Sequence, residues 1–104
     1  MRLLLALRVI PIGTNTPSLS KYVAEVINVL KELGYEYILS PFNTSIEIRD
    51  PKELSRILEQ IIERIRSLGV ERVAIDINID ARFDKEISLE YKIRAVEEKI
   101  RQGT

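Results

Sequence analysis

One segment of the sequence combines groups that could hold a small ligand: VIPIGTNTPSLSKYVAEV, residues 9–26. An apolar run ends at Pro11, hydroxyl and amide side chains follow, and a helical pattern then begins. A loop that leads into a helix often binds phosphate, because the N–H groups at the helix N-terminus attract anions. This loop has one glycine, Gly13, and lacks the Gly-Lys-Ser/Thr ending of a P-loop. It therefore does not match the known phosphate-binding signatures.

A second group of candidate residues follows later, where Asp76, Asn78, Asp80 and Asp84 recur at short intervals. Alternation along a strand places the first three on one face, and oxygen atoms of this kind can ligate a hard cation. No glycine-bearing twelve-residue loop accompanies them, which excludes a calcium site of the EF-hand type. We interpret these residues as part of a solvated strand face and turn, and expect no metal.

Composition narrows the chemistry further. The chain of 104 residues has no cysteine and no histidine. Their absence excludes disulfides, thiol catalysis, thiolate zinc sites and the general base that most often works near pH 7. The 16 basic and 16 acidic residues are interspersed, so the charge footprint of a nucleic-acid or membrane binder is missing. We therefore expect no enzyme, no nucleic-acid partner and no membrane partner.

The N-terminal run MRLLLALRVIPIG is too short for a secretion signal, is interrupted by Arg8, and lacks a small-residue cleavage site. We therefore expect a cytoplasmic protein. Abundant charged residues and isoleucine, together with the missing cysteine, favour a thermostable protein.

Seven elements must position these residues. Period-two alternation predicts strands over residues 3–10, 35–40, 44–49 and 70–79, with Pro41, Phe42 and Asn43 forming the turn between the second and third. Helical spacing predicts a helix from Ser18 or Ser20 to Gly34, another from Asp50 to Gly69, and a third from about residue 88. Asp50, Pro51 and Glu53 together form a strong helix-start pattern.

The order strand, helix, strand, strand, helix, strand, helix contains two crossover units that share one sheet. It predicts an α+β fold, a ferredoxin-like βαββαβ sandwich with an additional C-terminal helix, in a single domain over residues 1–104. Parity predicts which strand residues face the helices: Leu3, Leu5, Leu7, Val9, Ile46, Ile48, Val73, Ile75, Ile77 and Ile79.

The other face of the sheet is polar in its middle, as is typical of a solvated face and also of a binding site or subunit interface. The apolar stripe of the C-terminal helix must be buried either on this face or on a neighbouring subunit.

Two functions of the same fold class do not fit the residues. An acylphosphatase-like enzyme holds phosphate with an arginine in its first strand-to-helix loop, and residues 13–20 contain no arginine. An RNA-recognition module stacks bases on aromatic residues of its central strands, and here these strands have none.

Nearly the whole chain resembles the thiamine-binding protein family, small YkoF-like domains formerly of unknown function. The matching segments are VIPIGTNTPSLSKYVAEVINVLKELGYEYILSPFNTSIEIRD, GVERVAIDINIDARFDK and YKIRAV. Within them the resemblance rests on Pro11 with Gly13, Ser20 to Val23, Thr44 with Glu47, Arg72 with Val73, and Asp80, Arg82, Asp84 and Lys85. The family usually has a glycine where this chain has Ile48. The resemblance implies a ferredoxin-like fold, homodimers that pair into tetramers, and binding of thiamine or hydroxymethylpyrimidine without catalysis.

The loop and the hairpin offer groups that suit an aminopyrimidine. Hydroxyl and amide groups can donate to its ring nitrogens, a carboxylate such as Glu47 can accept from its amino group, and Tyr37 or Phe42 can stack on the ring. The predicted ligand-binding residues are Asn15, Ser18, Ser20, Tyr37, Phe42, Asn43, Thr44 and Glu47. A regular strand places Thr44 and Glu47 on opposite faces, so either a bulge turns one of them or only one contacts the ligand.

The predicted function is therefore a binding protein for thiamine or its hydroxymethylpyrimidine moiety, acting as a carrier, buffer or sensor. It requires no cofactor and forms a homo-oligomer, a dimer of dimers. The alternative is a structural or regulatory homo-oligomer whose pocket is vestigial.

Overall fold

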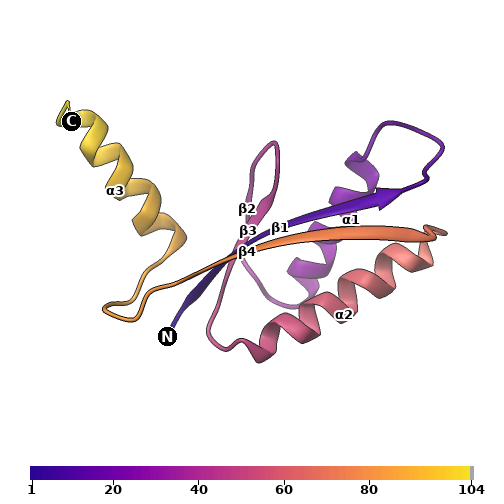
Figure 1. Ribbon diagram of the computed structural model, residues 1–104, viewed down its shortest axis with the longest axis horizontal. Helices are drawn as coiled ribbons and strands as arrows, with labels where there is room; N and C mark the ends of the chain where they lie inside the picture. Colours follow the sequence, from indigo (N-terminus) through magenta and orange to yellow (C-terminus); the bar gives the residue numbers. More distant parts are fainter. Residues whose placement is uncertain (104) are drawn as a thin grey trace.

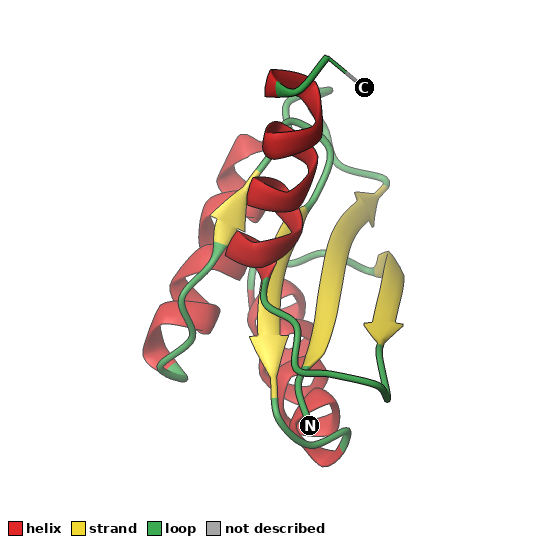
Figure 2. Ribbon diagram, turned by 90° about the vertical axis from the view of Figure 1, so that its left-hand side faces the viewer, coloured by secondary structure: helices red, strands yellow, loops and turns green. Residues whose placement is uncertain are grey.

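A computed structural model describes residues 1–103, which form a four-stranded sheet with two helices against one face (Figure 1). The predicted domain, residues 1–104, includes one residue outside that range. The elements follow the predicted order: β1 (Leu3–Ile12), α1 (Ser20–Glu32), β2 (Ile38–Leu39), β3 (Thr44–Ile48), α2 (Lys52–Ser67), β4 (Arg72–Ala81) and α3 (Leu89–Arg101). The strands lie in the order β2-β3-β1-β4 and all pairs are antiparallel. This is the predicted ferredoxin-like arrangement, and Figure 2 shows the strands from the side on which α3 lies nearest the viewer.

The core lies between the sheet and the pair α1 and α2. β1 and β3 contribute alternate residues to it, and α2 contributes Ile57, Ile61 and Ile65, four residues apart on one side of the helix. All three isoleucines are at most 1% exposed. The predicted helix-facing residues are confirmed except for Ile79, which is 55% exposed. Ile79 lies near the end of β4, a strand with a neighbour on one side only, and so does not join the core.

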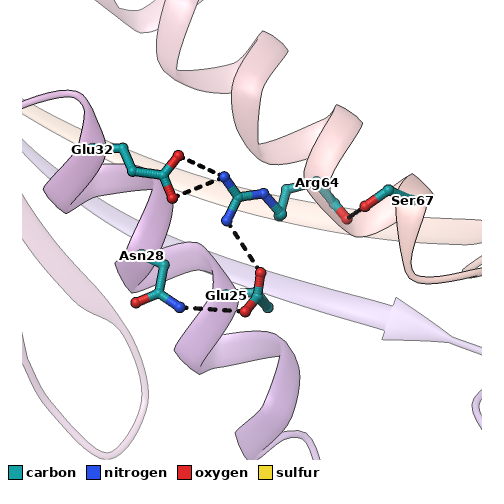
Figure 3. A network of polar contacts seen from close by, with 5 residues as sticks. All are labelled: Glu25, Asn28, Glu32, Arg64 and Ser67. Atoms are coloured by element: carbon teal, nitrogen blue, oxygen red, sulfur yellow. Dashed lines mark hydrogen bonds and ion pairs between the residues drawn. The ribbon is translucent and has the colours of Figure 1, made fainter.

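An arginine joins the two helices at their solvent side. The guanidinium of Arg64 on α2 donates to the carboxylate of Glu25, at 3.1 Å, and to both oxygens of Glu32, at 2.6 and 2.9 Å, on α1 (Figure 3). Because the planar guanidinium of Arg64 binds carboxylates at two positions along α1, the contact fixes how α2 is aligned along α1. Exposed pairs of this kind contribute little stability, so we regard it as a contact that sets orientation.

The start of α2 is closed by Glu53. Its carboxylate accepts hydrogen bonds from the backbone N–H groups of Arg49 and Asp50, at 2.7 and 2.8 Å, and from the Tyr35 hydroxyl at 2.6 Å. The hydrogen bond from Tyr35 is the main reason that the pKa of Glu53 is lowered, while burial and the same bond raise the pKa of Tyr35 to about 12. Asp50 completes the cap by accepting from the N–H of Lys52. The cap therefore ties the segments that follow α1 and β3 to the start of α2.

Glu53→Ala is expected to lower the free energy of unfolding by about 0.5 to 2 kcal/mol, the usual cost of losing a helix cap. Because the pKa of Glu53 is depressed in the folded state, its stabilising contribution is full above the ordinary glutamate pKa and is lost as the pH falls through the folded value. Urea unfolding of wild type and variant between pH 3 and 7 measures this. Glu59→Ala, an exposed change in the same helix, is the control. A difference between wild type and Glu53→Ala that does not shrink towards pH 3 contradicts the assignment.

The C-terminal helix α3 is separate from the helix layer (Figure 1). It begins at the open face of the sheet, where Leu89 and Lys92 border a recess with Leu4 and Ala6, and then extends away from the domain. Ser88 caps it by accepting from the N–H of Tyr91. None of its residues is buried, and its apolar residues are exposed to solvent. Within residues 1–103 the stripe of α3 thus stays largely uncovered.

Candidate functional site

A cavity opens where β1 continues beyond the end of β3. β1 pairs with β3 as far as the pair Leu7 and Thr44, but pairs with β4 as far as the pair Ile12 and Arg72. Residues 8–12 therefore have a strand partner on the β4 side only. The β2–β3 turn and the beginning of α1 border the space left on the other side. The cavity measures about 200 Å³ and is lined by Leu7, Arg8, Val9, Ile10, Leu19, Val23, Val26, Leu39, Ser40, Pro41, Phe42, Asn43 and Thr44.

Its walls are mainly apolar, and apart from Arg8 of β1 its polar side chains come from the hairpin. Leu19, Val23 and Val26 recur at helical spacing from the beginning of α1 and form one wall. Thr44, 4% exposed, is the one buried polar residue among those the structure describes. It brings a buried hydroxyl to a mainly apolar space. A flat ring with polar atoms on one edge fits such a surface, because small-molecule sites are mainly apolar with a few placed polar groups.

The hairpin turn is held in shape by Ser40 and Asn43. The Ser40 hydroxyl lies 3.0 Å from the Asn43 side-chain oxygen and accepts from the backbone N–H of Asn43 at 3.2 Å. The backbone N–H of Ser40 also donates to the carbonyl of Asn43 at 2.9 Å. At the tip between them, Phe42 is 79% exposed. The turn thus presents an aromatic ring at the rim of the cavity on a well-bonded support.

The structure brings together three of the eight predicted ligand-binding residues, Phe42, Asn43 and Thr44, around this cavity. Ser18 and Ser20 flank Leu19 and are exposed, with their hydroxyls 3.2 Å apart. Asn15 lies at a separate recess beside residues 68–71. Tyr37 and Glu47 border a third cavity, at the base of α3. The predicted set is therefore distributed over different surfaces.

Thr44 and Glu47 lie on opposite faces of the sheet, because the pairing of β3 with β1 is regular from Ile48 to Thr44 and contains no bulge. One Glu47 oxygen accepts from the backbone N–H of Leu89 at 2.7 Å, and the other lies 3.9 Å from the Arg2 guanidinium. The carboxylate thus holds the first residue of α3 against the sheet. A single pocket that contains both Thr44 and Glu47 does not form within residues 1–103.

Ten of the thirteen lining residues were not predicted as site residues, among them Leu19, Val23 and Val26 of the α1 wall. Their helical spacing is the same as that of a core stripe, and the sequence gives no signal that separates a residue facing a cavity from one facing a filled core. The relevant clue is the number of residues in β1 beyond its pairing with β3, which depends on tertiary register.

The acidic residues near the end of β4 are engaged by basic groups. Asp80 pairs with Lys92 of α3, and Asp84 binds Arg82 through two hydrogen bonds of 2.6 and 2.8 Å. Lys85 donates to the Tyr91 hydroxyl, which lowers the pKa of that phenol. Within residues 1–103 no three acidic side chains lie close enough to hold a metal. The Asp80–Lys92 pair thus connects β4 to α3, and the Lys85–Tyr91 contact connects the intervening loop to the same helix.

No helix in the described part of the chain has the length and apolar character needed to cross a membrane.

Comparison with known proteins gives a consistent result. The sequence model of a family described as thiamine-binding protein matches residues 5–97. The chain is 44% identical over 94 residues to the UPF0045 protein YqgV of Bacillus subtilis, covering 85% of this chain and 88% of that protein. It is 41% identical over 99 residues to a UPF0045 protein of Staphylococcus xylosus, covering 91% of this chain and 92% of that one.

Solved structures share the fold. The protein MJ1052 of Methanocaldococcus jannaschii superposes with a TM-score of 0.79 at 30% identity, over 93% of this chain and 97% of that one. A Thermotoga maritima protein, described as a candidate for thiamine biosynthesis or salvage, gives a TM-score of 0.69 at 20% identity, over 92% of this chain and 99% of that one. The second likeness concerns the fold alone.

Proposed function

We propose, from the premise that this chain belongs to the thiamine-binding protein family, that it binds thiamine or its hydroxymethylpyrimidine moiety and catalyses no reaction. The observation that carries the proposal is the cavity between β1, the start of α1 and the β2–β3 turn. It combines apolar walls, a buried hydroxyl and a strand edge without a partner. The protein would act as a carrier, buffer or sensor in the cytoplasm.

The size of the cavity suits one ring. Sites for drug-sized ligands measure about 300 to 1,000 Å³, and this cavity of about 200 Å³ is smaller. We therefore place the pyrimidine inside and the thiazolium outside, near the exposed Phe42. An aromatic face attracts an organic cation, which favours this orientation.

The unpaired edge of β1 can recognise the aminopyrimidine. A strand edge presents N–H and C=O groups in a row, and from Arg8 onward the β3 side of β1 has no strand to bind them. A ring nitrogen beside an exocyclic amino group offers an acceptor next to a donor, which complements such a row. The Thr44 hydroxyl at the end of β3 can also donate or accept a hydrogen bond.

Calorimetric titration with thiamine and with hydroxymethylpyrimidine tests the function. Thr44→Val is expected to weaken binding roughly two- to twelvefold, because a neutral hydrogen bond contributes about 0.5 to 1.5 kcal/mol. Glu47→Gln, on the opposite face of the sheet, is the matched control and should change affinity less than about twofold. Wild type that binds neither compound contradicts the function. Wild type that binds, with Glu47→Gln as the weaker variant, keeps the function and moves the site to the predicted Glu47 position.

Assembly into a homo-oligomer, a dimer of dimers, is part of the same proposal. The apolar residues of α3 are exposed, with Ile93, Val96 and Ile100 at 46%, 60% and 70%. Contiguous apolar surface of this kind is typical of an interface. The same stripe favours the alternative function, a structural or regulatory homo-oligomer with a vestigial pocket. Mass spectrometry of ligand released by denaturing the purified protein separates the two, because a vestigial pocket retains nothing.

A further inference from the structure

The cavity beside the end of β3 is bordered by a charge that neither hydroxymethylpyrimidine nor thiamine uses. Of its thirteen lining residues, only Arg8 carries a formal charge. Arg8 lies on β1, is exposed, and has no ion-pair partner within residues 1–103. Its cross-strand neighbour on β4, Asp76, is exposed as well and forms no ion pair with it. An unpaired guanidinium therefore borders the cavity.

The beginning of α1 adds to the positive potential at this cavity. Leu19, which lines the cavity, is the N-cap residue of the helix, and no side chain caps it. The first turn contains no acidic residue and includes Lys21. The N–H groups of an uncapped first turn carry a partial positive charge. Arg8 and this end of α1 thus both favour an anion at the cavity.

The cavity also contains a polar group without a protein partner. Thr44 is 4% exposed, and its hydroxyl makes no hydrogen bond within residues 1–103. No fully buried side-chain nitrogen or oxygen in that range lacks a partner, so this hydroxyl still reaches the accessible surface, which here is that of the cavity. A hydroxyl so deeply placed needs a hydrogen bond from a ligand or water. Thr44 is therefore available to orient a ring whose substituent lies beside Arg8.

The positive charge distinguishes three derivatives of the pyrimidine. The methylene group on the ring bears a hydroxyl in hydroxymethylpyrimidine, the thiazolium in thiamine, and a phosphate in the phosphate ester of the alcohol. With the ring inside the cavity and the thiazolium outside, this methylene group lies at the opening. A cation at the border repels the thiazolium and attracts the phosphate. Arginine also binds phosphate through two parallel hydrogen bonds, which the alcohol cannot accept in the same way.

We propose that the site prefers the phosphate ester of hydroxymethylpyrimidine to the free alcohol and to thiamine, and that Arg8 binds the phosphate. The inference rests on the proposed function, from which it takes the position of the pyrimidine ring. Phe42 favours the thiazolium instead, but its ring is 79% exposed, and such a contact contributes less than a pair between arginine and phosphate. Arg8 thus determines which derivative the site selects.

Calorimetric titration with the three compounds tests the preference. Wild type should bind the phosphate ester roughly 5- to 50-fold more tightly than the alcohol, because hydrogen bonds to charged groups are stronger than neutral ones. Inorganic phosphate at the same concentrations should give no measurable binding, since it lacks the ring.

Variants of two exposed arginines assign the preference to one residue. In Arg8→Gln the affinities for ester and alcohol should differ by less than about threefold, while the affinity for the alcohol stays within about twofold of wild type. Arg66→Gln, which removes an exposed charge on α2, is the matched control and should keep the full preference. A thermal scan of both variants checks that they are folded.

Removing the carboxylate opposite Arg8 provides an independent measurement. Asp76→Asn takes away the negative charge nearest to Arg8 across the strand pair and should raise the preference for the ester roughly two- to fivefold. A preference that falls in this variant contradicts the assignment of the phosphate to Arg8.

The outcomes separate this inference from the function on which it rests. Equal affinity of wild type for the ester and the alcohol overturns the inference and leaves the proposed function intact. A preference that persists in Arg8→Gln overturns the role of Arg8, and inorganic phosphate that binds as tightly as the ester shows recognition of an anion alone, which also overturns it. Wild type that binds none of the three compounds overturns the proposed function and the inference together.

Discussion

Leu19→Trp is expected to abolish thiamine binding, with a loss in affinity of at least about 100-fold, while the domain stays folded. Leu19 immediately precedes α1 and lines the cavity without being part of the fully buried core. An indole ring at this position occupies space that the pyrimidine would need. The backbone role of Leu19, whose carbonyl accepts from Tyr22 and Val23 at 3.0 Å, does not depend on the side chain.

Calorimetry measures the loss, and a thermal scan shows that the variant is folded. Ile62→Trp adds the same ring at an exposed site on α2, where Ile62 is 44% exposed, and should bind thiamine as wild type does. Equal affinity for wild type and a folded Leu19→Trp would exclude the cavity as the binding site.

Ile61→Ala is expected to lower the free energy of unfolding by about 2 to 5 kcal/mol, the usual range for a large-to-small change in a core. Ile61 is 0% exposed and lies in the middle of the α2 stripe that packs on the sheet. The cost combines lost burial with the cavity that the neighbouring side chains cannot fill.

The next residue in the chain is the control. Ile62 is 44% exposed, so Ile62→Ala should change stability by about 0.5 kcal/mol or less. Urea unfolding followed by circular dichroism measures both variants. Similar losses of stability in Ile61→Ala and Ile62→Ala would mean that α2 does not pack on the sheet with the side seen in the structure.

Most of the fold could be predicted from the sequence because its signals are local. Two helices end at glycines with positive φ, Gly34 at 88° and Gly69 at 85°, a conformation that glycine adopts without strain. Isoleucine and leucine recur every two residues in β1 and β3 and every four residues in α2. This spacing distinguishes the buried face of each element from its exposed face. The sheet order then follows from the two crossover units.

Predictions that depended on the end of an element were less accurate. Ser18 or Ser20 was expected to cap α1, but the N-cap is Leu19 and no side chain caps the helix. The two serine hydroxyls lie within hydrogen-bonding distance of each other instead. The second strand was predicted over residues 35–40 and includes only Ile38–Leu39, with Ser40 engaged in the turn.

The candidate site was harder to predict than the fold, because a cavity depends on how elements that are distant in sequence end relative to one another. The alternation along a strand predicts that Thr44 and Glu47 lie on opposite faces unless a bulge turns one of them. The pairing of β3 with β1 is regular and contains no bulge, so the two residues do lie on opposite faces. The contact between Glu47 and Leu89 joins residues 42 positions apart. No local sequence pattern predicts such a contact.

The exposed position of α3 has a consequence for its own stability. Apart from the contacts of its first turn with Glu47 and Asp80, a helix of 13 residues that buries none of them relies on local terms, and isolated helices of that length are marginal in water. Its cap at Ser88 and its ion pair between Glu90 and Arg94 contribute only modestly. In a solitary chain the amide protons of α3 therefore exchange with solvent far faster than those of α2. If the amide protons of α3 exchange slowly instead, another surface must cover the helix. The hydrogen-exchange rate of α3 therefore measures assembly of the protein without any label.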